Sequence, residues 1–257
     1  MSGLDLMQAL SVAQSAAFAA GELIDQHFRR GVDTRFKADD SPVTQADEDS
    51  EARIRAILQR HYPAHGIYGE EGGQHHLDAE YLWLVDPIDG TKSFVRGSPI
   101  FSTQIALMHR GELVLGVSYA SSWREMAWAV RGRGAWVDGR PARVAEFPLQ
   151  RATLSTGNLK SLIADPRRYL ALGELIRASH RGRGYGDFLH YHDLARGRID
   201  LVIESDVNIL DIAALVVIVR EAGGVFTDLD GAPIGLGTRS VLAGSPALHA
   251  EALARLR

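Results

Sequence analysis

The residues best suited to chemistry form one short stretch, Asp86-Pro87-Ile88-Asp89-Gly90-Thr91. It follows an apolar run, Tyr81 to Val85, which predicts a buried strand that ends within this stretch. The stretch places two aspartates at a strand end, followed by a glycine and a threonine that can begin a helix. This arrangement directs carboxylates and free N–H groups toward one point. Carboxylates suit a hard cation such as Mg²⁺, and helix-start N–H groups suit a phosphate. The stretch predicts a metal-assisted phosphate site, although the same residues are common in turns.

Two further acids stand in comparable settings. Glu70 follows a short strand-like run, His65 to Tyr68, and Asp211 stands at the start of a strongly apolar helix. Each has a simpler interpretation, because Glu70 fits an exposed acidic loop and Asp211 fits a charge stabilised by the helix dipole. The 257 residues include no cysteine, so thiol nucleophiles, thiolate metal sites and disulfides are excluded. Any metal must be held by oxygen or imidazole ligands.

The composition excludes several classes of protein. With 46% hydrophobic residues, 23% charged residues and a net charge of −4, the chain is neither fibrous, disordered nor a membrane protein. Its mild acidity argues against a nucleic-acid partner. The first residues lack the pattern of a secretory signal, and the longest apolar stretch, Ala213 to Val219, is too short to cross a bilayer. We expect a cytoplasmic protein that binds a small molecule and neither nucleic acid nor membrane.

The elements that position these residues fall into two groups. Apolar spacing predicts helices over residues 4–28 and 44–61, the second beginning with a capping box, and an antiparallel meander over 103–144. After residue 152 strands and helices alternate, which indicates a layered α/β arrangement. We expect an N-terminal α+β lobe over residues 1–145 with most of the candidate ligands, and a C-terminal α/β lobe over residues 146–257 that adds Asp211.

Four stretches together resemble the inositol monophosphatase superfamily of Mg²⁺-dependent phosphomonoesterases. They are Lys37 to Asp47, Gly69-Glu70-Glu71, Asp86 to Thr91, and Asp211 to Gly224. They occur in the order and spacing of that family across nearly the whole chain. The resemblance implies the layered α-β-α-β-α sandwich of the family, a metal site between the lobes, and a homodimer.

The resemblance also implies roles for individual residues. The ligands of two or three Mg²⁺ ions would be Glu70, Asp86, Asp89, Asp211 and the backbone carbonyl of Ile88. Gly90 and Thr91 would lie against the phosphate, and Thr91, paired with Asp47, would position the attacking water together with Glu70. Bound Mg²⁺ would offset the repulsion between hydroxide and a phosphate dianion and stabilise the leaving alkoxide. Asp47 can also cap its own helix, since one carboxylate has acceptor sites for both roles.

Substrate preference depends on the residues around the leaving group. Lys92-Ser93 and the segment Tyr185 to Tyr191 resemble the histidinol-phosphate phosphatase branch more than inositol monophosphatases. Histidinol phosphate carries an amino group, which Asp187 and Glu204 could bind, although Asp187 could equally cap the next helix. The expected substrate is L-histidinol phosphate. The alternatives are an inositol-1-monophosphatase, then a 3′,5′-bisphosphate nucleotidase or a non-catalytic binder of phosphorylated ligands. Leu210 stands where much of the family has an aromatic residue, which leaves one pocket wall undetermined.

Overall fold

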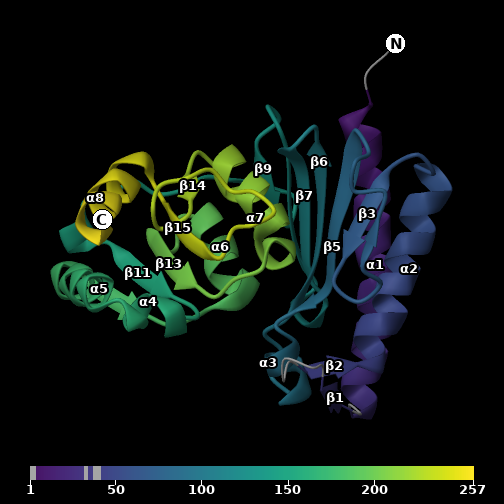
Figure 1. Ribbon diagram of the computed structural model, residues 1–257, viewed down its shortest axis with the longest axis horizontal. Helices are drawn as coiled ribbons and strands as arrows, with labels where there is room; N and C mark the ends of the chain where they lie inside the picture. The colour runs from purple at the N-terminus through teal and green to yellow at the C-terminus, as the bar shows by residue number, and fades with distance from the viewer. Residues whose placement is uncertain (1–3, 32–33, 37–41) are drawn as a thin grey trace.

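The described part of the chain, residues 4–31, 34–36 and 42–257 of a computed structural model, forms five layers. Figure 1 shows them from right to left as two helices, an eight-stranded sheet, two helices, a five-stranded sheet and an outer group of helices. The predicted α-β-α-β-α sandwich, an α+β fold, is therefore confirmed. Residues 37–41 of the first resembling stretch lie outside the described residues. None of the described helices is long and apolar enough to span a membrane.

Helices α1 (Leu6–Arg30) and α2 (Gln45–His61) cover the outer face of the large sheet. The predicted capping box opens α2, because the Thr44 N–H and hydroxyl donate to Asp47 over 2.8 and 2.6 Å. A small ribbon, β1 (Thr34–Phe36) and β2 (Pro42–Thr44), precedes that helix. In spatial order the large sheet contains β10 (Arg140–Ala142), β9 (Ala135–Val137), β8 (Glu125–Val130), β7 (Glu112–Ala120), β6 (Ser102–His109), β5 (Tyr81–Asp89), β3 (Gly66–Gly69) and β4 (Gln74–His75).

The middle layer contains α6 (Asp187–Ala195) and α7 (Ile209–Glu221), which lie between the two sheets. Helix α7 packs on β5 to β8 and on β14, so it is apolar nearly all round, as expected for a helix with protein on both sides. The second sheet contains β12 (Arg181–Arg183), β11 (Thr153–Thr156), β13 (Leu201–Ser205), β15 (Ser240–Gly244) and β14 (Val225–Thr227). The outer helices are α4 (Lys160–Ala164), α5 (Pro166–Ala178) and α8 (Pro246–Leu256). The division into lobes at residue 145 stays a prediction.

The predicted strand ends, as expected, within the stretch Asp86 to Thr91. Strand β5 continues to Asp89, and its register against β6 shifts between these two aspartates. Pro87 has no N–H for the ladder, and a local irregularity accommodates it, while its carbonyl accepts from the Thr103 hydroxyl over 2.9 Å. Both aspartates therefore lie on a buried central strand rather than in a mobile turn.

Candidate active site

One cavity of about 400 Å³, between the two sheets, brings most of the predicted site residues together. Its lining includes Glu70, Asp86, Ile88, Asp89, Gly90, Thr91, Asp187 and Asp211. A narrower hollow is lined by Glu204 as well as by Asp89, Asp187 and Asp211. Asp47 lies behind Thr91, whose hydroxyl is 3.4 Å from its carboxylate. Glu70 and Asp211, which are 141 positions apart in the sequence, therefore lie at a single acidic site.

The end of β5 is shaped for close approach of the backbone. Gly90 has a φ of +88°, and a Cβ at this position would lie 2.7 Å from the carbonyl oxygen of Ile100, so only glycine fits. The Gly90 carbonyl accepts from the N–H groups of Ser93 and Phe94, which starts the short helix α3 (Thr91–Val95). The Thr91 hydroxyl lies 2.9 Å from the Ile88 carbonyl. This turn presents both a threonine hydroxyl and backbone groups to the cavity.

Glu70 is placed by a residue that the sequence reasoning missed, Glu51 on α2. Glu51 is 1% exposed and accepts from the N–H groups of Glu71 and Gly72 over 2.6 and 2.8 Å. Arg55, one turn later, donates to Glu51 over 2.6 Å and also to the Gly73 carbonyl. The only signal in the sequence is an i, i+4 Glu–Arg pair, which is common on exposed helices. Here it anchors the loop that carries Glu70.

The carboxylate of Asp211 takes part in the capping box of its own helix and also lines the cavity. Its carboxylate accepts from the Asn208 N–H over 2.8 Å, and Asn208 caps the first turn of α7 in return. The simpler interpretation of Asp211 as a helix-start charge is thus correct, and it is compatible with a ligand role because the carboxylate retains further acceptor sites.

The electrostatics of the cavity favour a cation. Burial, followed by the charges of neighbouring carboxylates, raises the pKa of Asp86 and of Asp89 well above the usual aspartate range. Burial and the charges of Glu70, Glu204 and Asp187 also raise the pKa of Asp211, to about 7, against a hydrogen bond from Asn208 that lowers it.

The donor set fits a hard divalent ion. Among the described residues, no three His, Asp or Glu side chains form a ready-made metal cage. The carboxylates nevertheless border one cavity, interact strongly with one another and offer only oxygen ligands, which Mg²⁺ prefers. A divalent cation between them would relieve the repulsion that raises their pKa values.

The pKa shifts predict an unusual pH dependence of stability. Because Asp86, Asp89 and Asp211 have raised pKa values in the folded state, the stability they confer is present near pH 4 and is lost as pH rises to about 7 and beyond. In EDTA, we expect the protein to unfold roughly 5 °C or more lower at about pH 8 than at about pH 5.5, since about 1 kcal/mol moves Tm by 2–4 °C at this size. Saturating Mg²⁺ should remove most of this difference in a calorimetric scan. Equal melting temperatures in EDTA at both pH values would contradict the shifts.

Asp187 does not cap a helix, so that alternative is wrong. The N-cap of α6 is Gly186, and Asp187 follows it with a φ of +46°, a strained value for a residue with a side chain. Its carboxylate lies 3.4 Å from the Ser93 hydroxyl, on the side of the candidate ligands. Burial and the charge of Glu204 raise its pKa. The surrounding structure therefore maintains a strained backbone conformation at the point where it places a carboxylate at the cavity.

Glu204 is firmly held inside the narrow hollow. It is 3% exposed, and it accepts from the Tyr191 hydroxyl over 2.7 Å and from the Asn158 N–H over 3.1 Å, with His190 at 3.2 Å. Although burial opposes it, these partners lower its pKa and keep it ionised. The partner of His190 lies 14 residues away on another element, so no local pattern in the sequence predicts this contact.

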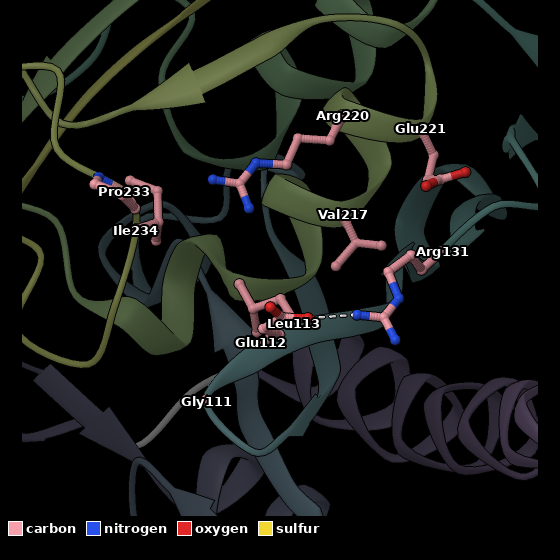
Figure 2. Close-up of a pocket in the computed structure, with 9 residues that line it drawn as sticks. All are labelled: Gly111, Glu112, Leu113, Arg131, Val217, Arg220, Glu221, Pro233 and Ile234. Atoms are coloured by element: carbon pink, nitrogen blue, oxygen red, sulfur yellow. Dashed lines mark hydrogen bonds and ion pairs between the residues drawn. The ribbon is translucent and has the colours of Figure 1, made fainter. Parts of the chain in front are cut away.

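A second hollow between the sheets, of about 330 Å³, has no comparable chemistry (Figure 2). Its two acids are already compensated: Glu112 pairs with Arg131 over 2.6 Å, and Glu221, at the end of α7, accepts from the N–H groups of Gly132 and Gly134, each over 2.9 Å. Both acids of this hollow already have hydrogen-bond partners, and it brings together no cluster of carboxylates like that of the acidic cavity.

Comparisons with known proteins agree with this geometry. The sequence profile of the inositol monophosphatase family matches residues 5–257. The chain is 42% identical to the histidinol-phosphatase of Mycobacterium tuberculosis over 266 residues, which span 100% of this chain and 99% of that protein.

Two solved structures share the fold. The extragenic suppressor protein suhB from Bartonella henselae superposes with a TM-score of 0.89 at 29% identity, covering 97% of this chain and 98% of that one. An inositol monophosphatase from Zymomonas mobilis superposes with a TM-score of 0.86 at 32% identity, covering 99% of both chains. With the family profile, these similarities extend over essentially the whole sequence. The chain therefore belongs to the inositol monophosphatase family and is a phosphoric monoester hydrolase.

Proposed function

We propose that this enzyme is a Mg²⁺-dependent phosphatase that hydrolyses L-histidinol phosphate to L-histidinol and phosphate. The observation that carries the proposal is that the cavity has two acids in addition to Glu70, Asp86, Asp89 and Asp211. Asp187 and Glu204 line the narrow hollow beside Asp89 and Asp211. A neutral polyol gains little from two additional carboxylates, whereas an ammonium group on the leaving alcohol gains charge-assisted hydrogen bonds.

The two extra acids have different parts in this proposal. Asp187 would make the direct contact with the amine. Its carboxylate lies 3.4 Å from the Ser93 hydroxyl, which is a long hydrogen-bond distance, so it retains acceptor sites for an ammonium group. Glu204 is occupied on one oxygen by Tyr191 and His190, so it contributes its charge and the remaining acceptor site of the other oxygen. Together they would bind the amine of the substrate while the phosphate faces the opposite end of the cavity.

The remaining residues would perform the hydrolysis. Glu70, Asp86, Asp89, Asp211 and the Ile88 carbonyl would hold two or three Mg²⁺ ions. When bound, Mg²⁺ supplies charge compensation for the phosphate and makes water more acidic. Thr91 donates one proton, to Ile88 or to Asp47, and keeps acceptor sites with which it and Glu70 orient the attacking water. The N–H groups from Gly90 onward would hold the phosphoryl oxygens.

Similarity to named relatives supports the reaction more strongly than the substrate. The Mycobacterium tuberculosis relative bears the name histidinol-phosphatase, whereas the Zymomonas mobilis structure is named an inositol monophosphatase at lower identity. An inositol-1-monophosphatase is therefore the second candidate. The leaving-group pocket distinguishes the two, since only one substrate carries a positive charge there.

Asp187→Asn tests this choice of substrate. We expect kcat/KM for histidinol phosphate to fall about 10- to 100-fold, because a charge-assisted contact is lost, while inositol 1-phosphate loses less than about threefold. Glu174→Gln, which removes an exposed acid on α5, is the control and should change neither substrate. Equal losses on both substrates after Asp187→Asn would show that Asp187 does not recognise the amine.

A further inference from the structure

Buried hydrogen bonds connect the candidate ligand Asp89 to helix α6 across three strands of the large sheet. The Ser102 hydroxyl lies 3.4 Å from the Asp89 carboxylate. On the same strand, the Gln104 side-chain nitrogen donates to Ser102 over 2.7 Å and to Ser118 on β7 over 3.0 Å. Ser118 lies 2.8 Å from the ring of His192 on α6. All five side chains are less than 9% exposed, so water does not compete strongly for these bonds.

The far end of this network is fixed by an ion pair. His192 is 2.7 Å from the Glu125 carboxylate, which also binds the guanidinium of Arg196 over 2.7 and 3.0 Å. Burial lowers the pKa of His192, and the bonds from His192 and Arg196 outweigh burial to bring the pKa of Glu125 to about 2. A neutral His192 therefore donates from Nδ1 to Glu125 and accepts the Ser118 proton at Nε2.

These directions define the role of Gln104. Because Ser118 gives its proton to His192, its oxygen must accept from Gln104, and the second N–H of the same amide then binds Ser102. The Ser102 proton is left free to donate to Asp89. If the amide were reversed, both serines would donate to it, and neither Asp89 nor His192 would receive a serine proton. In the structure the amide nitrogen of Gln104 faces both serines, which is the orientation that lets Ser102 donate to Asp89.

Gln104 holds this position at a cost. No described residue donates to its buried carbonyl oxygen. An unsatisfied buried acceptor destabilises the folded state, and an apolar side chain of similar volume would avoid this. The two donors of the amide are the feature that an apolar residue could not supply.

We propose that Gln104 is a positioning residue that, through Ser102, fixes the carboxylate of Asp89 for metal binding, with α6 as its anchor. The backbone N–H of Phe188, in the N-terminal turn of α6, also favours the charged form of Asp89 and opposes the rise in its pKa. Gln104 itself does not line the acidic cavity. The inference rests on the proposed metal role of Asp89, and it is independent of which phosphate ester is the substrate.

A double-mutant cycle of Gln104→Met and Ser102→Ala tests this role, with Mn²⁺ binding measured by electron paramagnetic resonance in the absence of substrate. We expect each single variant to weaken Mn²⁺ binding about tenfold, as is typical for partners of metal ligands. The double variant should bind Mn²⁺ about as weakly as the weaker of the two single variants, because both changes break the same connection to Asp89. The half-activating Mg²⁺ concentration should rise in parallel.

A matched control separates this role from simple destabilisation. His249 on α8 is another buried histidine, bonded to Thr227 over 2.8 Å and outside the cavity lining. His249→Gln should lower Tm and leave Mn²⁺ affinity unchanged. Wild-type affinity in Gln104→Met, or a double variant whose loss equals the product of the two single losses, would overturn the proposal. Ser102→Ala is the milder change and carries the test alone if Gln104→Met fails to fold. If histidinol phosphate were not the substrate, the Mn²⁺ affinities expected for these variants would not change.

Discussion

Asp89→Asn is expected to lower kcat for phosphate release about a thousandfold or more, which corresponds to ~4 kcal/mol of lost transition-state stabilisation. Asp89 is 7% exposed at the end of β5, faces Asp211 and Asp187, and has a strongly raised pKa. The amide of asparagine has nearly the same shape but no charge, so it would bind a divalent cation weakly and leave the phosphate dianion uncompensated. Phosphate release at saturating substrate over a series of Mg²⁺ concentrations measures the effect.

The same variant separates a metal role from a structural one. Because Asp89 repels its neighbours, its neutralisation should raise Tm in EDTA at about pH 8 rather than lower it. The control is Asp200→Asn. Asp200 is also buried, but it accepts from the Thr153 N–H over 2.7 Å and lies outside the cavity. That variant should keep its kcat, because Asp200 does not line the cavity. An Asp89→Asn enzyme with wild-type activity would show that the metal assignment is wrong.

Thr91→Val is expected to lower kcat about a hundredfold with little change in Mg²⁺ affinity. The hydroxyl of Thr91 is placed by the Ile88 carbonyl at 2.9 Å and by Asp47 at 3.4 Å. Valine keeps the shape of threonine but cannot bind water, and groups that orient or deprotonate a nucleophile contribute about 10²- to 10⁴-fold. Steady-state kinetics with titrated Mg²⁺ separate the two parameters.

Serine provides the matched control at this position. Thr91→Ser keeps the hydroxyl and should retain kcat within a few-fold, whereas Asp47→Asn should reproduce part of the Thr91→Val loss. Asp47 is 1% exposed and also receives two hydrogen bonds from Thr44, so its variant should lower Tm as well. Full activity in Thr91→Val would remove Thr91 from the account of water activation.

Local patterns predicted most of the fold because they encode local interactions. The capping box at Thr44 and the helices predicted over residues 4–28 and 44–61 lie at or close to their predicted positions. Short elements such as α4 and β12 were missed, since five and three residues carry too little periodicity. The exact last residue of β5 could not be predicted, because Pro87 interrupts a strand unless a register shift accommodates it, as it does here.

The candidate site was predictable only as far as its residues form motifs. Glu70, Asp86, Asp89 and Asp211 stand in recognisable stretches, and the structure places all four around one cavity. Glu51, Gln104 and His192 act through partners on other strands and helices, at separations of 14 to 74 residues. Such contacts leave no local pattern in a single sequence. The residues that support a site are therefore harder to find than those that face the substrate.

The most direct test of the account is phosphate release from the purified protein, measured side by side on histidinol phosphate, inositol 1-phosphate and adenosine 3′,5′-bisphosphate, with Mg²⁺ or EDTA. Release should require Mg²⁺, and kcat/KM for histidinol phosphate should be about a hundredfold above that for the other two esters, or ~2.7 kcal/mol of additional transition-state binding. A preference for inositol 1-phosphate would contradict the role of the acidic pocket, and undiminished release in EDTA would contradict the metal-dependent chemistry itself.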